Sequence, residues 1–234
     1  MRPAGPPEPR HRPIPLLGQL PPSTRPALSD LTLPDLQAVQ RRRKRVLGFA
    51  SVTVLFAVLA VGSSWPEGSW TRRAIGDAGI LLILTAIVGR AWCSLYIGGR
   101  KKSELVQEGP YSLCRNPLYS FSIIGTFGAL AQTGSILLAL AFTVVTVLIF
   151  IPVVRQEEVY LSRAFPEAYE IYARPTPRFL PDPRLWRTSS ELIIRPGLFV
   201  RTLLDGLPFL AAWPLLEFIG RLHDGPLPPL LRLP

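Results

Sequence analysis

Residues 108–119 read E-G-P-Y-S-L-C-R-N-P-L-Y, a polar, turn-rich stretch between two long apolar runs. Gly109 tolerates unusual backbone dihedrals and Pro110 fixes its own φ, so the pair predicts a turn. Pro117 suits the first turn of a helix, and the unpaired N–H groups of a helix N-terminus can bind an anion. The stretch therefore indicates either a ligand site or a cap at the membrane interface, with its tyrosines at headgroup depth.

A second polar segment, residues 155–181, follows the next apolar hairpin and begins R-Q-E-E-V-Y-L. The adjacent Glu157 and Glu158 would point about 100° apart on a helix, so only one of them can face a site directly. A solvated, charged helix end explains the pair as well as acid–base chemistry does. We expect residues 155–172 to continue the preceding helix inward, with Pro166 ending one section and starting another. We predict that the two polar segments meet on one side of a membrane and form an active site.

The composition favours a membrane protein. Hydrophobic residues make up 48% of the 234-residue chain and charged residues 18%, below the roughly 25% charged residues of ordinary soluble domains. The net charge of +10 fits loops biased to the cytoplasmic side. The basic residues have no interleaved aromatics, so we expect no nucleic-acid partner. The only two cysteines, Cys93 and Cys114, do not suggest a disulfide framework, and histidines confined to the terminal tails make a metal site improbable.

Residues 1–45 are expected to form a disordered cytoplasmic tail with a basic end. Ten of the 26 prolines fall in residues 1–40, and that density denies the backbone a regular ladder. The run R-R-R-K-R at 41–45 directly precedes an apolar run and should stay cytoplasmic. A nuclear-localisation interpretation is weaker, because the adjoining segment is a span. A partner could bind the proline-rich tail, although a plain tail is the simpler interpretation. No cleavable signal peptide is visible.

The apolar runs predict an all-α, polytopic membrane helix bundle of about five transmembrane helices. The runs are residues 46–64, 74–97, 118–132, 135–154 and 198–219. The first two form a unit at 46–97 with a short outer loop at 65–73. The third run is short for a full crossing and forms a tight hairpin with the fourth around Thr133-Gly134. The fifth is broken by prolines and fits either a kinked span or a re-entrant pair.

Charged and small residues inside the spans carry further expectations. Asp77 lies near the outer end of the second span and Arg90 toward its inner end. A charge at the bilayer centre is expensive, so each should snorkel or face the bundle. Small residues on the third helix should let a neighbouring helix approach closely. They are Gly125, Gly128, Ala129 and Ala131.

The distribution of basic residues predicts the orientation. An in-out-in-out-in path puts residues 1–45, 98–118 and 155–195 on the cytoplasmic side, and these hold 20 of the 26 Lys and Arg residues. That excess is what the positive-inside rule expects. We divide the rest of the chain into a catalytic region at 98–186 and a C-terminal kinked or re-entrant apolar segment with a proline-rich tail at 187–234.

The order of these motifs resembles the isoprenylcysteine carboxyl methyltransferase family and its phospholipid methyltransferase relatives. There, a segment like L-V-x-x-G-x-Y precedes R-H-P-x-Y, a helical hairpin follows, and E-E-x-x-L, F-x-x-x-Y-x-x-Y and P-R-x-x-P come next. The matching positions here are Leu105-Val106, Gly109-Pro110-Tyr111, Arg115-Asn116-Pro117-Leu118-Tyr119, Glu157-Glu158-Val159-Tyr160-Leu161, Phe165, Tyr169, Tyr172 and P-R-F-L-P at 177–181. The resemblance covers about a third of the chain, residues 103–181.

The resemblance implies S-adenosylmethionine as methyl donor, bound at the cytoplasmic face, and a lipophilic acceptor in the membrane. Carboxyl O-methylation of an isoprenylcysteine-like or other lipid-like carboxylate is favoured. Phospholipid or amine N-methylation, an NADPH-dependent reductase of the sterol-reductase type and a non-catalytic scaffold are the alternatives. By position, the family's cofactor contacts fall on Glu104, Leu105, Val106, Tyr111, Asn116, Pro117, Leu118, Tyr119 and Glu157.

Two positions carry the implied chemistry. In the carboxyl methyltransferases an arginine just before the glutamates serves the substrate, and Arg155 is the nearest candidate here, about two residues closer to them. If the acceptor is an amine, Glu157 or Glu158 becomes the candidate base, so Arg155 and Glu158 are the expected catalytic residues. The family histidine is Asn116 here, which can donate and accept hydrogen bonds but cannot become cationic. No dinucleotide fingerprint, phosphate loop or G-x-S-x-G motif is present.

Overall fold

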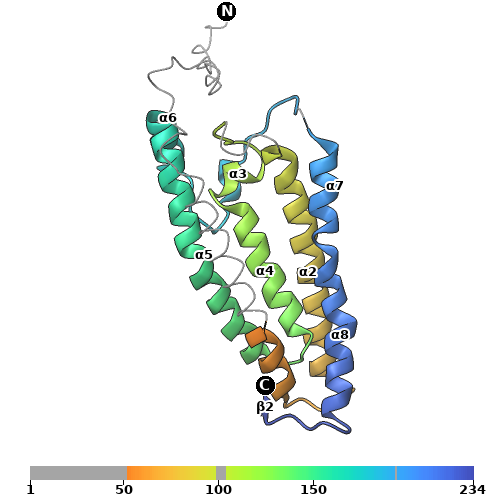
Figure 1. The fold of residues 1–234 in the computed structure, drawn as a ribbon. Helices are drawn as coiled ribbons and strands as arrows, with labels where there is room; N and C mark the ends of the chain where they lie inside the picture. Colours follow the sequence, from red (N-terminus) through yellow and green to blue (C-terminus); the bar gives the residue numbers. More distant parts are fainter. Residues whose placement is uncertain (1–51, 99–103, 193) are drawn as a thin grey trace, which may run out of the picture.

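The computed structural model describes residues 52–98, 104–192 and 194–234, and they form an elongated bundle of helices (Figure 1). The predicted tail at 1–45 lies outside the described residues, as does the first part of the predicted span at 46–64, of which residues 52–60 are helical. The remaining elements are β1 Val61–Ser63, α2 Trp70–Ile97, α3 Pro110–Leu113, α4 Pro117–Ala131, α5 Ile136–Ala164, α6 Pro166–Ala173, the 3₁₀ helix η4 Pro183–Leu185, α7 Pro196–Leu204, α8 Leu207–His223 and β2 Leu231–Leu233.

The expectation of a helical membrane bundle is confirmed. Three helical stretches of the described chain are long and apolar enough to cross a membrane, and they are Trp70–Ile97, Ile136–Ala164 and Pro196–His223. The third predicted span is the shorter apolar helix α4. Most of α5 is not covered by other helices, and Val144 and Leu148 are among its exposed apolar side chains. Such a surface is stable where lipid is the solvent.

The start of α2 corrects one expectation. The loop predicted at 65–73 is shorter, because the helix begins at Trp70. Ser69 is the cause, since its hydroxyl accepts a hydrogen bond from the Arg72 amide at 3.3 Å. An N-terminal serine cap of this kind satisfies a backbone donor that would otherwise be unpaired.

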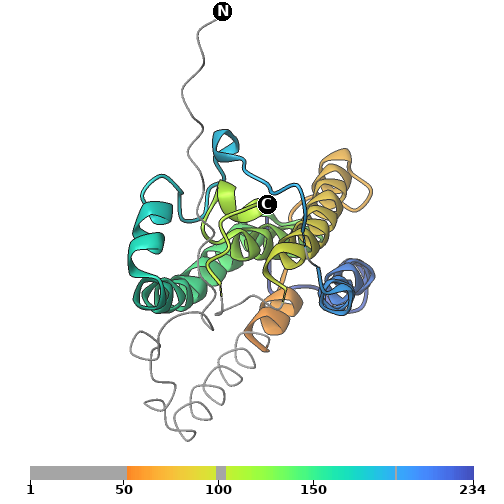
Figure 2. The ribbon, with the colours of Figure 1, turned by 90° about the horizontal axis from the view of Figure 1, so that it is seen from above.

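The α2–α4 seam is a close contact of two helix backbones. A Cβ atom on Gly128 would lie 2.7 Å from the Gly79 carbonyl oxygen, and one on Gly79 would lie 2.8 Å from the Gly128 oxygen. Small residues let helices approach in this way where lipid supplies no hydrophobic drive for association. Gly125 faces Ala86 along the same seam. Seen from above, α4 therefore lies between α2 and α5 (Figure 2).

The hairpin and its inward continuation follow the sequence-based expectation. The turn between α4 and α5 contains Gly134 with φ at 77°, and Ser135 caps α5 by accepting from the Leu138 amide at 3.2 Å. Helix α5 continues through residues 155–164 without a break, and Pro166 then opens α6. Proline fits a first helical turn because the N–H that it lacks would have no intrahelical partner there.

The fifth apolar run is a bent span. Helices α7 and α8 follow one another along the α2 side of the bundle (Figure 1), with the break at Asp205 and Gly206. The helical stretch, 196–223, extends beyond the predicted 198–219 at both ends. The two helices together are long and apolar enough to cross a membrane, which fits the kinked alternative.

The chain after α8 was expected to be a proline-rich tail and instead forms a strand. β2 pairs in parallel with β1, with Val61 opposite Leu231 and Ser63 opposite Leu233. The last residue continues the contact, because the Pro234 carbonyl accepts from the Leu137 amide at 3.0 Å. Three-residue strands give no alternating hydrophobic pattern in the sequence, so periodicity could not reveal them. We call residues 223–234 the C-terminal clasp.

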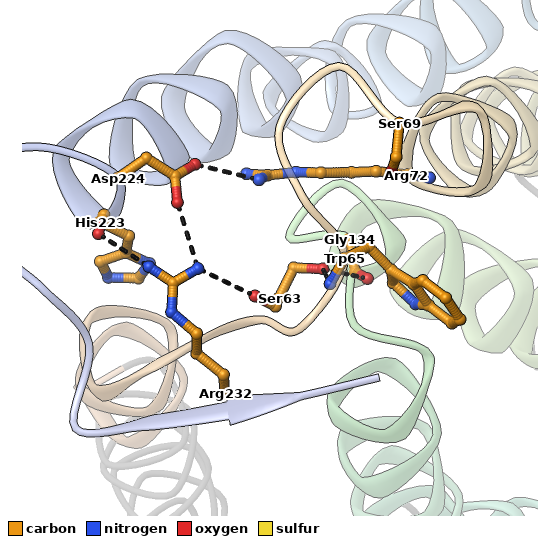
Figure 3. Close-up of polar contacts among 8 residues, drawn as sticks. All are labelled: Ser63, Trp65, Ser69, Arg72, Gly134, His223, Asp224 and Arg232. Atoms are coloured by element: carbon orange, nitrogen blue, oxygen red, sulfur yellow. Dashed lines mark hydrogen bonds and ion pairs between the residues drawn. The ribbon is translucent and has the colours of Figure 1, made fainter.

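Ion pairs hold the clasp to the bundle (Figure 3). Asp224 lies between two arginines, 3.1 Å from Arg72 of α2 and 3.2 Å from Arg232 of β2. The His223 ring lies 3.0 Å from the Leu59 carbonyl. The clasp thereby ties the segment before β1, the start of α2 and the end of α8 together at the end of the bundle where the α4–α5 turn lies.

Candidate active site

A cavity of about 370 Å³ lies at the opposite end of the bundle from the clasp, where α3 and α6 are found (Figure 1). Its volume is within the range of small-molecule sites. The walls come from the segment before α3, from α3 and the start of α4, and from α5 and α6. The lining residues are Ile97, Glu104, Leu105, Val106, Tyr111, Arg115, Asn116, Leu118, Tyr119, Val153, Gln156, Glu157, Glu158, Tyr160, Leu161, Tyr169 and Tyr172.

Most of the residues expected from the sequence line this cavity. Pro117 is absent from the lining; it is buried at the first turn of α4. Arg155 is exposed on α5 and is also absent from the lining. The two polar segments, which residues 120–154 separate in sequence, therefore do form one cavity. The expected residues that line it are Glu104, Leu105, Val106, Tyr111, Asn116, Leu118, Tyr119, Glu157 and Glu158.

The backbone before α3 is fixed by a glycine in a left-handed conformation. Gly109 has φ at 60°, and a Cβ atom there would lie 2.4 Å from the ring of Tyr96. Its amide donates to the Arg187 carbonyl at 2.8 Å. Tyr111 follows two residues later, and its carbonyl accepts from the Tyr172 hydroxyl at 2.8 Å. These contacts hold α3 against α6, so one wall of the cavity is rigidly attached to another.

An ionic network beside the cavity joins the two polar segments. Glu158, which is buried in α5, pairs with Arg178 at 2.7 Å and with Arg115 at 3.4 Å. The Asn116 side-chain amide donates to the same carboxylate at 3.2 Å. Sequence reasoning quoted Arg115 and Arg178 within their motifs but gave them no role. The sequence did contain an indication of these roles. A buried carboxylate needs charged or hydrogen-bonding partners, and the neighbouring motifs contain two arginines.

Three buried polar atoms of residues that line the cavity make no hydrogen bond of good geometry within the described part of the chain, although the Tyr169 hydroxyl lies beside Arg115. They are the hydroxyls of Tyr111 and Tyr169 and the Nε of Arg115. Buried polar atoms without partners are rare in folded proteins and call for an explanation. Burial raises the pKa of both tyrosines, although Arg115 acts to lower the pKa of Tyr169, so each phenol stays protonated at neutral pH and can donate. A polar ligand that reached these side chains would give the atoms a partner.

The cavity is divided in chemical character. Glu104 and Glu157 supply negative charge and Arg115 supplies a guanidinium. Leu118 and Val153 are apolar lining residues from α4 and α5. The Tyr119 ring packs edge-to-face on Phe150 of α5, with ring centroids 5.0 Å apart. Such a cavity suits a ligand that carries both charges and an apolar or aromatic body.

Metal ligands are not grouped in the part of the chain that the structure describes, since no three of His, Cys, Asp and Glu lie together there. Cys93 and Cys114 are both buried and free. The described residues thus offer neither a disulfide nor a metal cluster for the site.

The fold and the cavity define an integral membrane protein with a small-molecule site at one end of a helix bundle. A family model described as "Phospholipid methyltransferase" matches residues 70–168, a range that includes most of the cavity lining. The family model and the similarity to an isoprenylcysteine enzyme support a membrane methyltransferase of the isoprenylcysteine and phospholipid type. No solved structure matches the chain.

Three curated relatives show how far the similarity extends. The "Nickel-cobalt-cadmium resistance protein NccN" of Alcaligenes xylosoxydans xylosoxydans is 43% identical over 68% of this chain and 74% of its own length. The "Cobalt-zinc-cadmium resistance protein CzcN" of Cupriavidus metallidurans is 39% identical over 74% of this chain and 80% of its own. The "Protein-S-isoprenylcysteine O-methyltransferase B" of Arabidopsis thaliana is 34% identical over 44% of this chain and 54% of its own.

Proposed function

We propose that this membrane methyltransferase uses S-adenosylmethionine and transfers its methyl group to a lipophilic carboxylate in the membrane, of the isoprenylcysteine type or another lipid-like acid. The observation that carries the proposal is the single cavity lined by eight of the nine expected cofactor contacts, with three buried polar atoms that make no hydrogen bond of good geometry within the described part of the chain. The similarity to a plant isoprenylcysteine O-methyltransferase supports the same reaction class.

The donor set of the cavity fits S-adenosylmethionine. That molecule carries a carboxylate, an ammonium and a sulfonium on a nucleoside. Arg115 would pair with the carboxylate, because guanidinium groups bind carboxylates through two donors. Glu104 and Glu157 would favour the two positive groups, and the tyrosines would donate to its oxygens and nitrogens. When bound, this donor supplies an electrophilic methyl group that needs little further activation.

The chemistry left to the protein is alignment. A carboxylate acceptor is already nucleophilic at pH 7, so no base is needed, and holding two reactants in line lowers the barrier by removing the entropy cost of their meeting. The state of Glu158 supports such an acceptor. Its oxygens accept hydrogen bonds from Arg178 and Asn116, and Arg115 forms an ion pair with Oε1 at 3.4 Å, so both oxygens of Glu158 are already engaged.

The resemblance gives an arginine before the glutamates a role with the acceptor substrate, whereas the carboxylate of the cofactor needs a cation inside the cavity. Arg155 is exposed and does not line the cavity, whereas Arg115 lines it with an unpartnered Nε. We therefore propose Arg115 as the carboxylate-binding arginine of the cavity. Arg155 stays a candidate only for an acceptor that reaches the site along the exposed face of α5.

Amine methylation is the second candidate, and the description of the matching family model favours it. An amine acceptor must lose a proton, and Glu157 is the half-exposed carboxylate that lines the cavity. The names of the two metal-resistance relatives state a phenotype and no reaction, so they do not choose between the acceptors.

We further propose that the cavity faces the cytoplasm. The segments at that end of the described chain, residues 104–118 and 155–195, hold eight of the Lys and Arg residues. The positive-inside rule keeps such segments on the cytoplasmic side. Labelling of single-cysteine variants at the two ends of the bundle with a membrane-impermeant reagent would test the orientation in whole cells.

Calorimetric titration of the purified protein in detergent tests the cofactor. We expect saturable binding of S-adenosylmethionine and of its demethylated product, and none of NADPH. Tyr119→Ala and Glu157→Ala should weaken binding while the protein stays folded. Binding of NADPH in place of S-adenosylmethionine would favour a reductase, and binding of neither would favour a non-catalytic scaffold. Mass spectrometry of lipid extracts incubated with labelled donor then identifies the acceptor.

A further inference from the structure

Residues 177–182, which follow α6, lie along residues 113–120, which contribute to the cavity wall. The Arg115 amide donates to the Pro177 carbonyl at 2.8 Å, and the Asp182 amide donates to the Leu113 carbonyl at 2.9 Å. Between them, the Ser120 hydroxyl donates to the Phe179 carbonyl at 2.7 Å. We call residues 177–182 the strap. Its backbone is thus fixed at three points against residues 113–120, and its one side chain in the ionic network is Arg178.

Arg178 holds Glu158 through a two-pronged contact. Its Nε donates to both carboxylate oxygens at 3.1 Å, and its Nη2 donates to Oε2 at 2.7 Å. Such forked pairs are the strongest and most directional ion pairs in proteins. The Arg115 contact with the same carboxylate is longer, 3.4 Å from Nη1. Arg178 is therefore the main partner of Glu158, and Arg115 is a secondary one.

Asn116, at the position of the family histidine, is fully used by the same network. Its amide nitrogen donates both to Glu158 Oε1 and to the Arg178 carbonyl, each at 3.2 Å. An amide group has only two hydrogens to donate. Asn116 thus cross-links the start of α4 to the strap and to α5, and only its carbonyl oxygen is left for a ligand.

The strong contact of Arg178 with Glu158 affects how Arg115 can act in the cavity. Glu158 needs positive partners because an unpaired buried carboxylate is costly. If Arg178 were absent, Arg115 would be the remaining cation in contact with Glu158. It would then turn its fork toward that carboxylate, and the unpartnered Nε at the cavity would no longer be offered to a ligand.

We propose that Arg178 is a positioning residue for ligand binding: by neutralising Glu158 through the strap, it leaves the Arg115 guanidinium available to a carboxylate in the cavity. The inference rests on the proposed use of S-adenosylmethionine, whose carboxylate is the ligand group in question. Arg178 itself does not line the cavity, so it acts through Glu158 and Arg115.

The test compares two donors on the Arg178→Gln protein by calorimetry. S-adenosylmethionine carries the carboxylate, and decarboxylated S-adenosylmethionine keeps the nucleoside, sulfonium and amine without it. We expect affinity for the first to fall by at least about tenfold, the loss of one charge-assisted contact, and affinity for the second to stay within about twofold. A merely structural defect would weaken both donors alike.

Arg184→Gln is the matched control, because Arg184 follows the strap closely and makes the same kind of fork with Asp182 but is 89% exposed. It should bind both donors like the wild type. Arg178→Lys keeps the charge but not the fork, so its affinity should be intermediate. In the double variant Arg178→Gln, Glu158→Gln, the competitor for Arg115 is gone, and the affinity for S-adenosylmethionine should recover to within about threefold of wild type.

Equal loss of both donors, unchanged binding of S-adenosylmethionine by Arg178→Gln, or no recovery in the double variant would each overturn the proposal. If Arg178→Gln does not fold, Arg178→Lys gives the same comparison of the two donors, because it keeps a positive partner for Glu158. If the wild-type protein binds neither donor, the proposed function itself fails, and that result is seen before any substitution is made.

Discussion

Arg115 is the residue on which the assignment of the cavity depends most directly. Arg115→Gln should weaken S-adenosylmethionine binding by at least about tenfold, because a neutral amide cannot replace a charge-assisted fork. Calorimetry of the folded variant measures this. Arg174→Gln is the control, since Arg174 is 81% exposed and pairs only with Glu170 one turn away. Arg155→Gln completes the set: it should bind S-adenosylmethionine like the wild type, because Arg155 does not line the cavity, and a larger loss there than at Arg115 would contradict the assignment.

Removal of the Tyr111 hydroxyl should affect protein stability and cofactor affinity in opposite directions. Its hydroxyl is buried without a partner, which costs about 1–3 kcal/mol in the ligand-free protein. Tyr111→Phe should therefore leave the melting temperature unchanged or raise it, and should weaken cofactor binding. Burial raises the pKa of Tyr111, so the phenol is protonated across the working range and the loss should not depend on pH between 6 and about 9. A lower melting temperature would show that the hydroxyl has a partner within the protein.

The residue scale also shows why some site residues were predictable and others were not. Tyr119 and Glu157 belong to motifs whose order along the chain is specific, so a resemblance could assign them. The partners of Glu158 depend on which arginine the strap brings to it, and the strap is an irregular, proline-rich segment with no periodic pattern. The sequence therefore points to Arg155, and only the geometry shows that Arg115 is the arginine that lines the cavity.

At the scale of elements, the α2–α4 seam sets the position of the cavity wall. Gly128→Ala should destabilise the protein, because the new Cβ would lie 2.7 Å from a backbone oxygen and 2.8 Å from Leu82 Cβ. Overpacking of this kind costs about 1–3 kcal/mol and should exceed the gain of up to about 1 kcal/mol from alanine's helix propensity. Thermal unfolding in detergent measures the difference.

Gly197→Ala is the matched control for the seam, since nothing lies within 4 Å of a Cβ atom there. It has the same gain in helix propensity without the clash, so its melting temperature should equal or exceed that of the wild type. If Gly128→Ala were as stable as Gly197→Ala, the helices would have room to separate, and the close seam would not be needed to hold α4.

Sequence periodicity predicted the elements well where the apolar runs are long. The end of α2, the start of α5 and the break at Pro166 follow from composition, caps and proline geometry, whereas the start of α2 lies four residues before the predicted one. The method could not find β1 and β2, which have three residues each. Their pairing depends on two segments about 170 residues apart, and nothing local in either one indicates the other.

At the scale of the whole molecule, one end of the bundle holds the ligand cavity and the other end is held together by the C-terminal clasp. The cavity, the ionic network and the strap lie at one end, and the C-terminal clasp closes the other (Figure 1). The helices between them are joined by close packing and by a few polar contacts, such as those from Arg90 to Ser122 and from Gln132 to the Gly76 carbonyl. Changes at the clasp should therefore alter stability without altering the affinity of the cavity.

Asp224 makes that separation measurable through pH. Burial alone would raise its pKa, but hydrogen bonds from Arg72 and Arg232 outweigh burial and lower it. A carboxyl whose pKa is lower in the folded state stabilises the fold fully above its unfolded pKa of about 3.9, and this contribution is lost as pH falls through the lower, folded value. The charged and titratable groups facing it are Arg72 on α2, Arg232 on β2 and the adjacent His223.

Asp224→Asn should therefore melt at a lower temperature than the wild type at pH 7, and the gap between the two proteins should narrow as pH falls below about 4. Affinity for S-adenosylmethionine at pH 7 should be equal in both, because the substitution lies at the far end from the cavity. Glu217→Gln is the control: its partner Arg221 is one turn away on the same helix and largely exposed, so its effect on melting should be small. A constant gap between Asp224→Asn and the wild type across the acid range would mean that the clasp is held by β1–β2 pairing and not by the ion pairs.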